Sequence, residues 1–272
     1  MLRWIGLLLI AYLVVVVLAW AFQDRLLYLP SVPGQEIDQT PGDRGWTYEE
    51  VWLESSDGHQ IHGWWLPVEE ARGTLLFFHG NAGNISHRLD TLAVFRNLNL
   101  SVLIIDYQGY GKSEGSPSET ATEADARAAW DYLTEDRGLA PGEIVVAGRS
   151  LGSAVAAELA RAHAPAGVLL ESPFASLPEL AQQVYPFLPG RWLTRYDYAT
   201  RTHVAEIQAP VMVIHSRDDE IIPFSQGEAV YDAVGGSARL LELSGGHNTA
   251  FLQNRDRYME GMEAFLTEEL GW

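Results

Sequence analysis

Cysteine is absent from this chain of 272 residues. Its absence excludes disulfide bonds, zinc sites built from thiolates and a cysteine nucleophile, and it is compatible with either side of a membrane. Hydrophobic residues make up 47% of the chain. At this length, such a content predicts one globular domain with a real core rather than a disordered chain.

Basic residues are scarce: 18 lysines and arginines stand against 36 aspartates and glutamates, and the formal net charge is -18. Because a nucleic-acid backbone or an anionic lipid surface would repel such a chain, we expect no nucleic-acid partner. Six of the eight histidines show no metal-ligand spacing, so the sequence predicts no metal site and no cofactor. These histidines are His59, His62, His87, His163, His203 and His215.

A long uncharged segment lies near the N-terminus. No charged residue occurs between Trp4 and Phe22, and a helix of that length, at about 1.5 Å per residue, approaches the roughly 30 Å hydrocarbon thickness of a bilayer. Trp4 and Trp20 lie near its two ends, where indole rings favour the water interface. The sequence therefore predicts a single-pass membrane anchor over residues 1–25, followed by a globular domain over residues 26–272.

A cleaved secretory signal is the alternative interpretation of the same segment, because Ala19, Trp20 and Ala21 form a small-x-small site after an apolar run. Arg3 and the terminal amine favour a cytoplasmic N-terminus. With an anchor of that orientation, we expect the globular domain on the periplasmic or extracellular side of the membrane.

Strands and helices alternate along the rest of the chain. Two strands, Thr47–Leu53 and His59–Trp65, flank a Ser-Ser-Asp-Gly turn and predict an antiparallel hairpin. Further strands are expected at 74–78, 102–105, 144–147, 168–170, 211–215 and 239–243, and helices at 120–137, 151–162, 225–234 and 257–270. This order predicts an α/β fold with a mostly parallel eight-stranded sheet and helices on both faces.

Residues 172–210 interrupt the alternation with proline and aromatic residues. The segment is interpreted as a short insertion that acts as a lid over a binding site. An ordinary helical excursion, with its aromatic side chains packed into the core, is the alternative.

Gly148-Arg149-Ser150-Leu151-Gly152 follows a predicted strand and opens an alanine-rich helix. A sharp turn between strand and helix exposes a serine hydroxyl, and the flanking glycines avoid collisions in that turn. We therefore predict that Ser150 is a nucleophile. In this arrangement the acid and the histidine follow the serine in chain order.

The predicted base is His247, the last histidine of the chain, in a glycine-bearing loop after the strand at 239–243. Its acidic partner should follow the strand at 211–215, where the sequence offers Asp218, Asp219 and Glu220. The pattern of residue types leaves the choice among these three carboxylates open, since only one of them is needed to orient the imidazole.

Two backbone amides are expected to bind the oxyanion of an acyl-transfer reaction: those of Leu151, after the serine, and Asn81, after the strand at 74–78. The loop that begins at Asp106 is rich in glycine and could form a second active-site cluster. We interpret it as structural, because an aspartate at a strand end followed by glycines usually fixes a tight loop.

The order of the motifs HGNAGN, DYQGYGKSEGSPSE, GRSLGSAVA, HSRDDEIIPFSQG and GGHN resembles that of the α/β-hydrolase superfamily. The resemblance covers nearly the whole chain. More narrowly, the chain resembles a membrane-anchored branch of the superfamily that contains animal protein depalmitoylases and bacterial relatives. The D-x-x-x-P pattern of that branch selects Asp219, with Pro223, as the acid. The palmitoylated cysteines of the animal enzymes have no counterpart here.

The resemblance implies a serine hydrolase that cleaves carboxylic esters or thioesters through an acyl-enzyme, with Ser150, Asp219 and His247 as triad and a small-molecule or lipid acyl group as substrate. A peptidase or amidase that uses the same triad is one alternative. A non-catalytic, membrane-anchored binding module is the other, because a fold does not guarantee an activity.

Overall fold

A computed structural model describes residues 2–272, whose strands form one eight-stranded sheet. The strands are β1 (Glu49–Glu54), β2 (Gln60–Leu66), β3 (Gly73–Phe78), β4 (Leu100–Ile105), β5 (Ile144–Arg149), β6 (Gly167–Glu171), β7 (Val211–Ser216) and β8 (Ala238–Leu243). They lie in the order β1-β2-β4-β3-β5-β6-β7-β8. The β1–β2 and β2–β4 pairs are antiparallel and the other neighbouring pairs are parallel. The predicted sheet, with its N-terminal hairpin, is confirmed.

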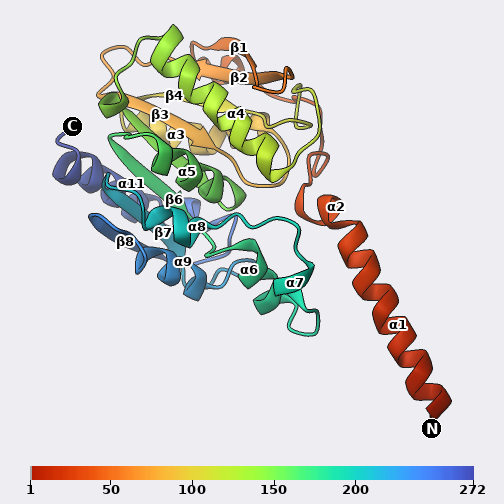
Figure 1. Cartoon of the computed structure of the whole chain (residues 1–272). Coiled ribbons are helices and arrows are strands. Elements are labelled where there is room, and N and C mark those ends of the chain that lie inside the picture. Colours follow the sequence, from red (N-terminus) through yellow and green to blue (C-terminus); the bar gives the residue numbers. More distant parts are fainter. Residues whose placement is uncertain (1) are drawn as a thin grey trace.

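A hydrophobic cluster covers each face of the sheet, because successive side chains of a strand point to opposite faces. In β3, Leu76 and Phe78 join one cluster, whereas Leu75 and Phe77 join the other. Helices α4 (Glu119–Asp131), α5 (Leu151–Ala162), α8 (Thr200–Val204) and α9 (Phe224–Tyr231) pack into the first cluster, and α3 (Leu89–Asn97) and α11 (Arg255–Ala264) into the second. Helices thus lie on both faces, as predicted (Figure 1).

The remaining elements are short except for the first. They are α1 (Leu2–Ala21), α2 (Gln23–Leu27), α6 (Leu177–Val184), α7 (Gly190–Leu193), α10 (Ala250–Gln253), the 3-10 turns η1 (Pro41–Arg44), η2 (Ile85–Arg88) and η4 (Pro141–Glu143), and the π-helical turns η3 (Tyr132–Asp136) and η5 (Phe265–Glu269).

Helix α1 projects away from the domain (Figure 1). Its residues Arg3–Ala21 are long and apolar enough to cross a membrane and are not buried against the rest of the chain. Length and composition of this kind also fit a signal sequence. The structure therefore agrees with both interpretations of this segment.

Residues 172–210 leave the sheet after β6 and return at β7, and carry α6, α7 and α8. Two of their aromatic side chains, Phe174 and Tyr198, are buried in the core. Three others, Tyr185, Phe187 and Trp192, are exposed. The segment thus combines a packed base with an exposed tip, and the tip contacts α1, because the Tyr12 hydroxyl donates a hydrogen bond to the Phe187 carbonyl at 2.9 Å.

Candidate active site

The residues predicted to act together follow the carboxyl ends of four parallel strands. Asn81 follows β3, Ser150 follows β5, Asp219 follows β7 and His247 follows β8. Parallel strands bring their carboxyl ends to one edge of the sheet, where open α/β sheets bind their ligands. The sheet order therefore explains why residues far apart in the sequence meet here.

Ser150 occupies a strained turn between β5 and α5, with φ 54° and ψ -120°. A positive φ is costly for a residue with a side chain, and such strain is common where a side chain is held for function. The turn needs its glycines: a Cβ on Gly148 would lie 2.0 Å from the Gly152 carbonyl oxygen, and one on Gly152 would lie 2.1 Å from the Phe78 oxygen. The amide of Ser150 donates to the Glu171 carbonyl at 2.8 Å and fixes the turn to β6.

The imidazole of His247 is buried and pairs with Asp219, since its Nδ1 lies 2.7 Å from Asp219 Oδ2. The other carboxylate oxygen, Oδ1, accepts hydrogen bonds from the amides of Ile221 at 2.9 Å and Ile222 at 2.8 Å. Burial raises the pKa of Asp219, but hydrogen bonds from His215 and His247 outweigh it and hold the pKa well below its usual range. The carboxylate is therefore ionised and set to orient the imidazole.

The two rival carboxylates contact the backbone of the histidine loop rather than the imidazole. Asp218 Oδ2 accepts a hydrogen bond from the Gly245 amide at 3.0 Å, and Glu220 Oε2 accepts one from the His247 amide at 3.0 Å. Asp218 and Glu220 are exposed, whereas Asp219 is buried. All three carboxylates thus hold the loop, and Asp219 alone is hydrogen-bonded to the ring.

Arg149 links the serine turn to the histidine loop, a role that the sequence did not predict. Its Nη2 donates to the His247 carbonyl oxygen at 2.7 Å, and its Nε lies 3.4 Å from Glu171 Oε1. The Tyr258 hydroxyl donates to Glu171 Oε2 at 2.9 Å. The one signal in the sequence for this linking role is that Arg149 directly precedes Ser150 in the chain.

Ser150 and His247 line one cavity of about 330 Å³. Asn81 and Leu151, the predicted oxyanion donors, line it as well. Within residues 2–272 the amides of Asn81 and Leu151 donate no hydrogen bond, so both are available to a ligand. Apolar side chains form much of the remaining wall: Leu27, Leu29, Phe174, Leu177, Leu180, Ile221 and Ile222.

The loop that carries Asn81 is held on several sides. His79 Nδ1 lies 2.7 Å from the Gly80 carbonyl oxygen, and because a carbonyl only accepts, this nitrogen carries the hydrogen. The Tyr110 hydroxyl donates to the Asn81 carbonyl at 2.8 Å, and Asn81 Nδ2 donates to the Leu27 carbonyl at 2.8 Å. In a trans peptide the N–H points opposite to the C=O, so fixing the Gly80 carbonyl also fixes the direction of the Asn81 amide.

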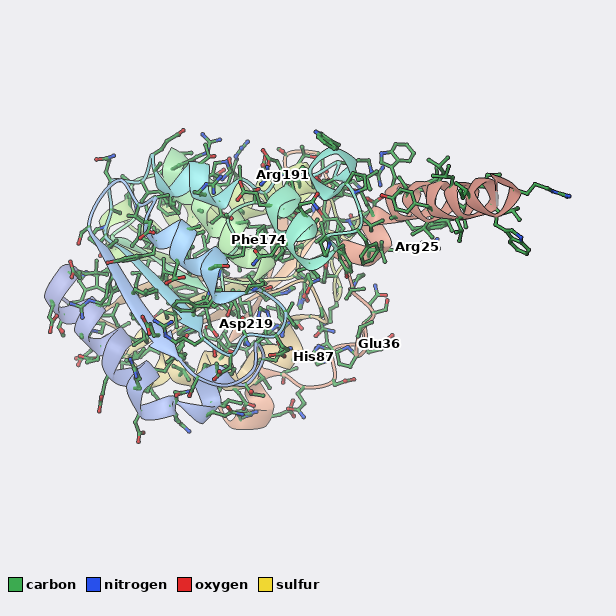
Figure 2. The ribbon with its side chains drawn as sticks, turned by 90° about the horizontal axis from the view of Figure 1, so that it is seen from below. Arg25, Glu36, His87, Phe174, Arg191 and Asp219 are labelled. Atoms are coloured by element: carbon green, nitrogen blue, oxygen red, sulfur yellow. The ribbon has the colours of Figure 1, made fainter. Side chains whose placement is uncertain are left out.

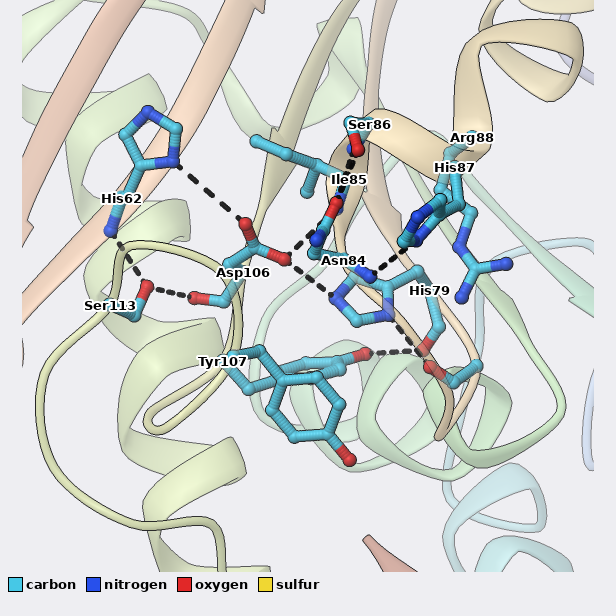
Figure 3. Close-up of polar contacts among 12 residues, drawn as sticks. His62, His79, Asn84, Ile85, Ser86, His87, Arg88, Asp106, Tyr107 and Ser113 are labelled. Carbon is cyan, nitrogen blue, oxygen red and sulfur yellow. Dashed lines mark hydrogen bonds and ion pairs between the residues drawn. The ribbon is translucent and has the colours of Figure 1, made fainter. Parts of the chain in front are cut away.

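Asp106 lies in a separate buried cluster shown in Figure 3. Its Oδ1 accepts a hydrogen bond from the Ile85 amide at 3.0 Å and lies 3.5 Å from His79 Nε2, and its Oδ2 lies 3.8 Å from His62 Nδ1. Gly111 packs against this carboxylate at a φ of 50°. These contacts tie the loop after β4 to the loop after β3, in agreement with a structural interpretation. Among the described residues, no cluster of potential ligands could hold a metal ion.

Comparisons with known proteins agree with this architecture. Residues 69–196 match the family model described as serine aminopeptidase, S33. The chain is 36% identical over 260 residues to the uncharacterized protein Rv2307c of Mycobacterium tuberculosis, covering 93% of this chain and 90% of that one. It is 37% identical over 228 residues to the alpha/beta hydrolase domain-containing protein WAV2 of Arabidopsis thaliana, covering 76% of this chain and 74% of that one.

Among solved structures, the Pyrococcus furiosus esterase Pf2001 is similar in fold. Its TM-score is 0.72 at 18% sequence identity, and the match covers 86% of this chain and 95% of that one. An identity this low concerns the fold and not the reaction.

Proposed function

Because this chain belongs to the α/β-hydrolase superfamily and is a hydrolase, we propose that it cleaves carboxylic esters or thioesters of acyl substrates through a Ser150 acyl-enzyme. His247 is the general base and Asp219 orients it. The amides of Asn81 and Leu151 bind the oxyanion. One observation carries the proposal: Ser150 shares a cavity with an imidazole whose Nδ1 is bonded to a buried carboxylate at 2.7 Å.

The chemistry follows from that hydrogen bond. With Nδ1–H donated to Asp219, the lone pair of the imidazole is on Nε2, which takes the proton of the Ser150 hydroxyl as its oxygen attacks the acyl carbon. The carbonyl oxygen gains negative charge and is bound by the Asn81 and Leu151 amides. Collapse of the intermediate breaks the bond to the alcohol or thiol, which leaves with the proton held by His247. Water then repeats these steps on the acyl-enzyme.

The apolar wall supports an acyl group as the recognised part of the substrate. Phe174, Leu177 and Leu180 come from the segment 172–210, and Leu27 and Leu29 from the connection after α1. Burial of hydrocarbon stabilises binding by about 0.8 kcal/mol per methylene group. A substrate with an acyl chain therefore gains affinity from residues that lie next to the proposed membrane anchor.

A peptidase or amidase activity is the second candidate, favoured by the description of the family model as serine aminopeptidase, S33. The same triad can cleave an amide, and the two candidates differ in the leaving group that the cavity accepts. Turnover of aminoacyl arylamides in preference to aryl esters would favour this candidate. Loss of all turnover and labelling would instead favour the non-catalytic binding module.

Labelling by a fluorophosphonate probe tests the proposal directly, because such probes react with an activated serine. We expect Ser150→Ala to lose both labelling and hydrolysis of a short p-nitrophenyl ester while retaining the thermal unfolding midpoint of the wild type. Ser116→Ala is the matched control, since Ser116 is exposed and outside the cavity. Near wild-type activity in Ser150→Ala would refute the assignment.

A further inference from the structure

The cavity around Ser150 differs in charge from the rest of the molecule. The chain has twice as many acidic as basic residues, 36 against 18. The residues that line the cavity nevertheless include two arginines, Arg88 and Arg149, and no aspartate or glutamate. A concave site in which a low-dielectric wall surrounds charge of one sign attracts ligands of the opposite sign.

The two arginines differ in what they bind. Arg149 is engaged by Glu171 and by the His247 carbonyl, as described above. Arg88, at the end of η2, donates from Nη2 to the Ala82 carbonyl. Within residues 2–272 no carboxylate lies within 4.0 Å of its guanidinium, and its buried Nε has no hydrogen-bond partner. Figure 3 shows this side chain turned away from Asp106.

The Arg88 guanidinium is charged at neutral pH. Burial, followed by the positive charge of Arg149, lowers its pKa to about 10, which leaves it protonated at pH 7. A charge taken out of water is costly unless a partner of opposite charge or several hydrogen bonds compensate it. Arg88 has one carbonyl partner and lines the Ser150 cavity, so an anion bound in that cavity could accept further hydrogen bonds from the guanidinium, apart from its buried Nε.

We propose that Arg88, with Arg149 beside it, forms an anion subsite in the Ser150 cavity, and that the preferred ester or thioester carries a carboxylate or a phosphate. The inference rests on the proposed hydrolase function and adds the charge of its substrate. The guanidinium is suited to this role, because its N–H donors form a fork that matches both anions. Combined with the apolar wall, the subsite selects an anionic amphiphile.

Carboxylate and phosphate share this chemistry but would come from different parts of the substrate. An anion on the acyl side corresponds to the half-ester of a dicarboxylic acid. A phosphate on the leaving-group side corresponds to an acyl ester of glycerol phosphate, as in a lipid headgroup. Two pairs of substrates distinguish these sources: mono-p-nitrophenyl suberate against p-nitrophenyl octanoate, and the hexanoyl ester of glycerol phosphate against that of glycerol.

The test measures kcat/KM for both pairs with the full-length protein in detergent. We expect the wild type to prefer the anionic member of at least one pair. In Arg88→Gln this preference should fall by about tenfold to a hundredfold, the size expected for a charge-assisted hydrogen bond, mainly through KM. Arg88→Lys should keep part of it. The pair that responds identifies the source of the anion.

Arg96→Gln is the matched control, because Arg96 lies on the neighbouring helix α3 and packs on Trp46 outside the cavity. Fluorophosphonate labelling of Arg88→Gln is the control that checks whether the serine site is still formed. Equal kcat/KM for the neutral and anionic members in the wild type, or a preference that Arg88→Gln leaves unchanged, would overturn the inference while the hydrolase function stands.

A direct binding measurement tests the anion subsite even if the protein hydrolyses none of these esters. Suberate and inorganic phosphate are added to Ser150→Ala, and the shift of the thermal unfolding midpoint is followed against concentration. A saturable shift that is lost in Ser150→Ala combined with Arg88→Gln supports the subsite even if the hydrolase function fails. A shift that is absent, or indifferent to Arg88, refutes it.

Discussion

At the scale of single residues, the sequence left open which carboxylate is the acidic partner of His247. Three neighbouring carboxylates were available, and each contacts a different atom of the loop at 245–247. Residue types alone could not separate them, because the distinction depends on which oxygen meets the ring nitrogen in three dimensions. The family pattern favoured Asp219, and it is Asp219 that is buried and lies 2.7 Å from Nδ1.

Asp219→Asn should lower kcat by about 10³-fold to 10⁴-fold, because the amide no longer holds the imidazole in the required tautomer or stabilises its cation. Asp218→Asn is the matched comparison. Its side chain accepts only a backbone hydrogen bond from Gly245 at the surface, so we expect a loss of less than about tenfold. The measurement is kcat on one activated ester for both variants. Equal losses would reassign the acid.

At the scale of elements, α4 carries a buried carboxylate that fastens it to the loop after β4. Asp125 accepts hydrogen bonds from the Gln108 amide at 2.8 Å and from Gln108 Nε2 at 3.1 Å. Burial raises its pKa to about 6, against an ordinary value of 3.8, although the bonds from Gln108 oppose the shift. The folded chain therefore binds a proton that the unfolded chain releases between these two values.

Stability should consequently fall as the pH rises from about 4 to 6, because in that window the folded state holds the additional proton. Asp125→Asn removes this dependence. We expect the free energy of unfolding of Asp125→Asn, relative to wild type, to be greater at pH 8 than at pH 4 by about 2 kcal/mol. Urea unfolding at the two pH values measures it. Asp131→Asn, an exposed aspartate at the end of the same helix, should show no such difference.

Buried strands and the serine turn were predictable from the sequence, whereas the two cavity arginines were not. Strands such as β5 and β7 are buried on both faces and begin with apolar runs, so the pattern alone predicted them as strands of a parallel sheet. The turn at Ser150 was predictable because its glycines are required by backbone contacts that the motif encodes. The positions of Arg88 and Arg149 were not predictable, because both line a cavity that is assembled from distant loops.

At the scale of the whole molecule, exposed aromatic side chains gather near the end from which α1 projects. Arg25 and Arg191 lie near this end, together with the acidic Glu36 (Figure 2). The exposed aromatic residues Tyr185, Phe187 and Trp192 belong to the segment that contacts α1. Aromatic and basic side chains are enriched where proteins meet the membrane interface. This end of the domain therefore suits a position against the bilayer that α1 is proposed to cross.

The absence of cysteine allows the orientation to be measured on the full-length protein, because one introduced thiol is the only site for a maleimide. Ser116 is exposed, and Ser116→Cys should leave the cavity intact. If the domain lies outside the cytoplasm, a membrane-impermeant maleimide should label Ser116→Cys in spheroplasts as completely as after permeabilisation. The wild type, without cysteine, is the control for background labelling.

Mass and extraction distinguish an anchor from a cleaved signal in the same samples. An anchor predicts a labelled chain that retains its first 25 residues and stays with the membrane in alkaline carbonate, since a helix of this length is held by its buried apolar surface. A shortened chain released by carbonate would support the signal peptide. Labelling only after permeabilisation would place the domain in the cytoplasm, and the active site would then meet acyl substrates from the inner face of the bilayer.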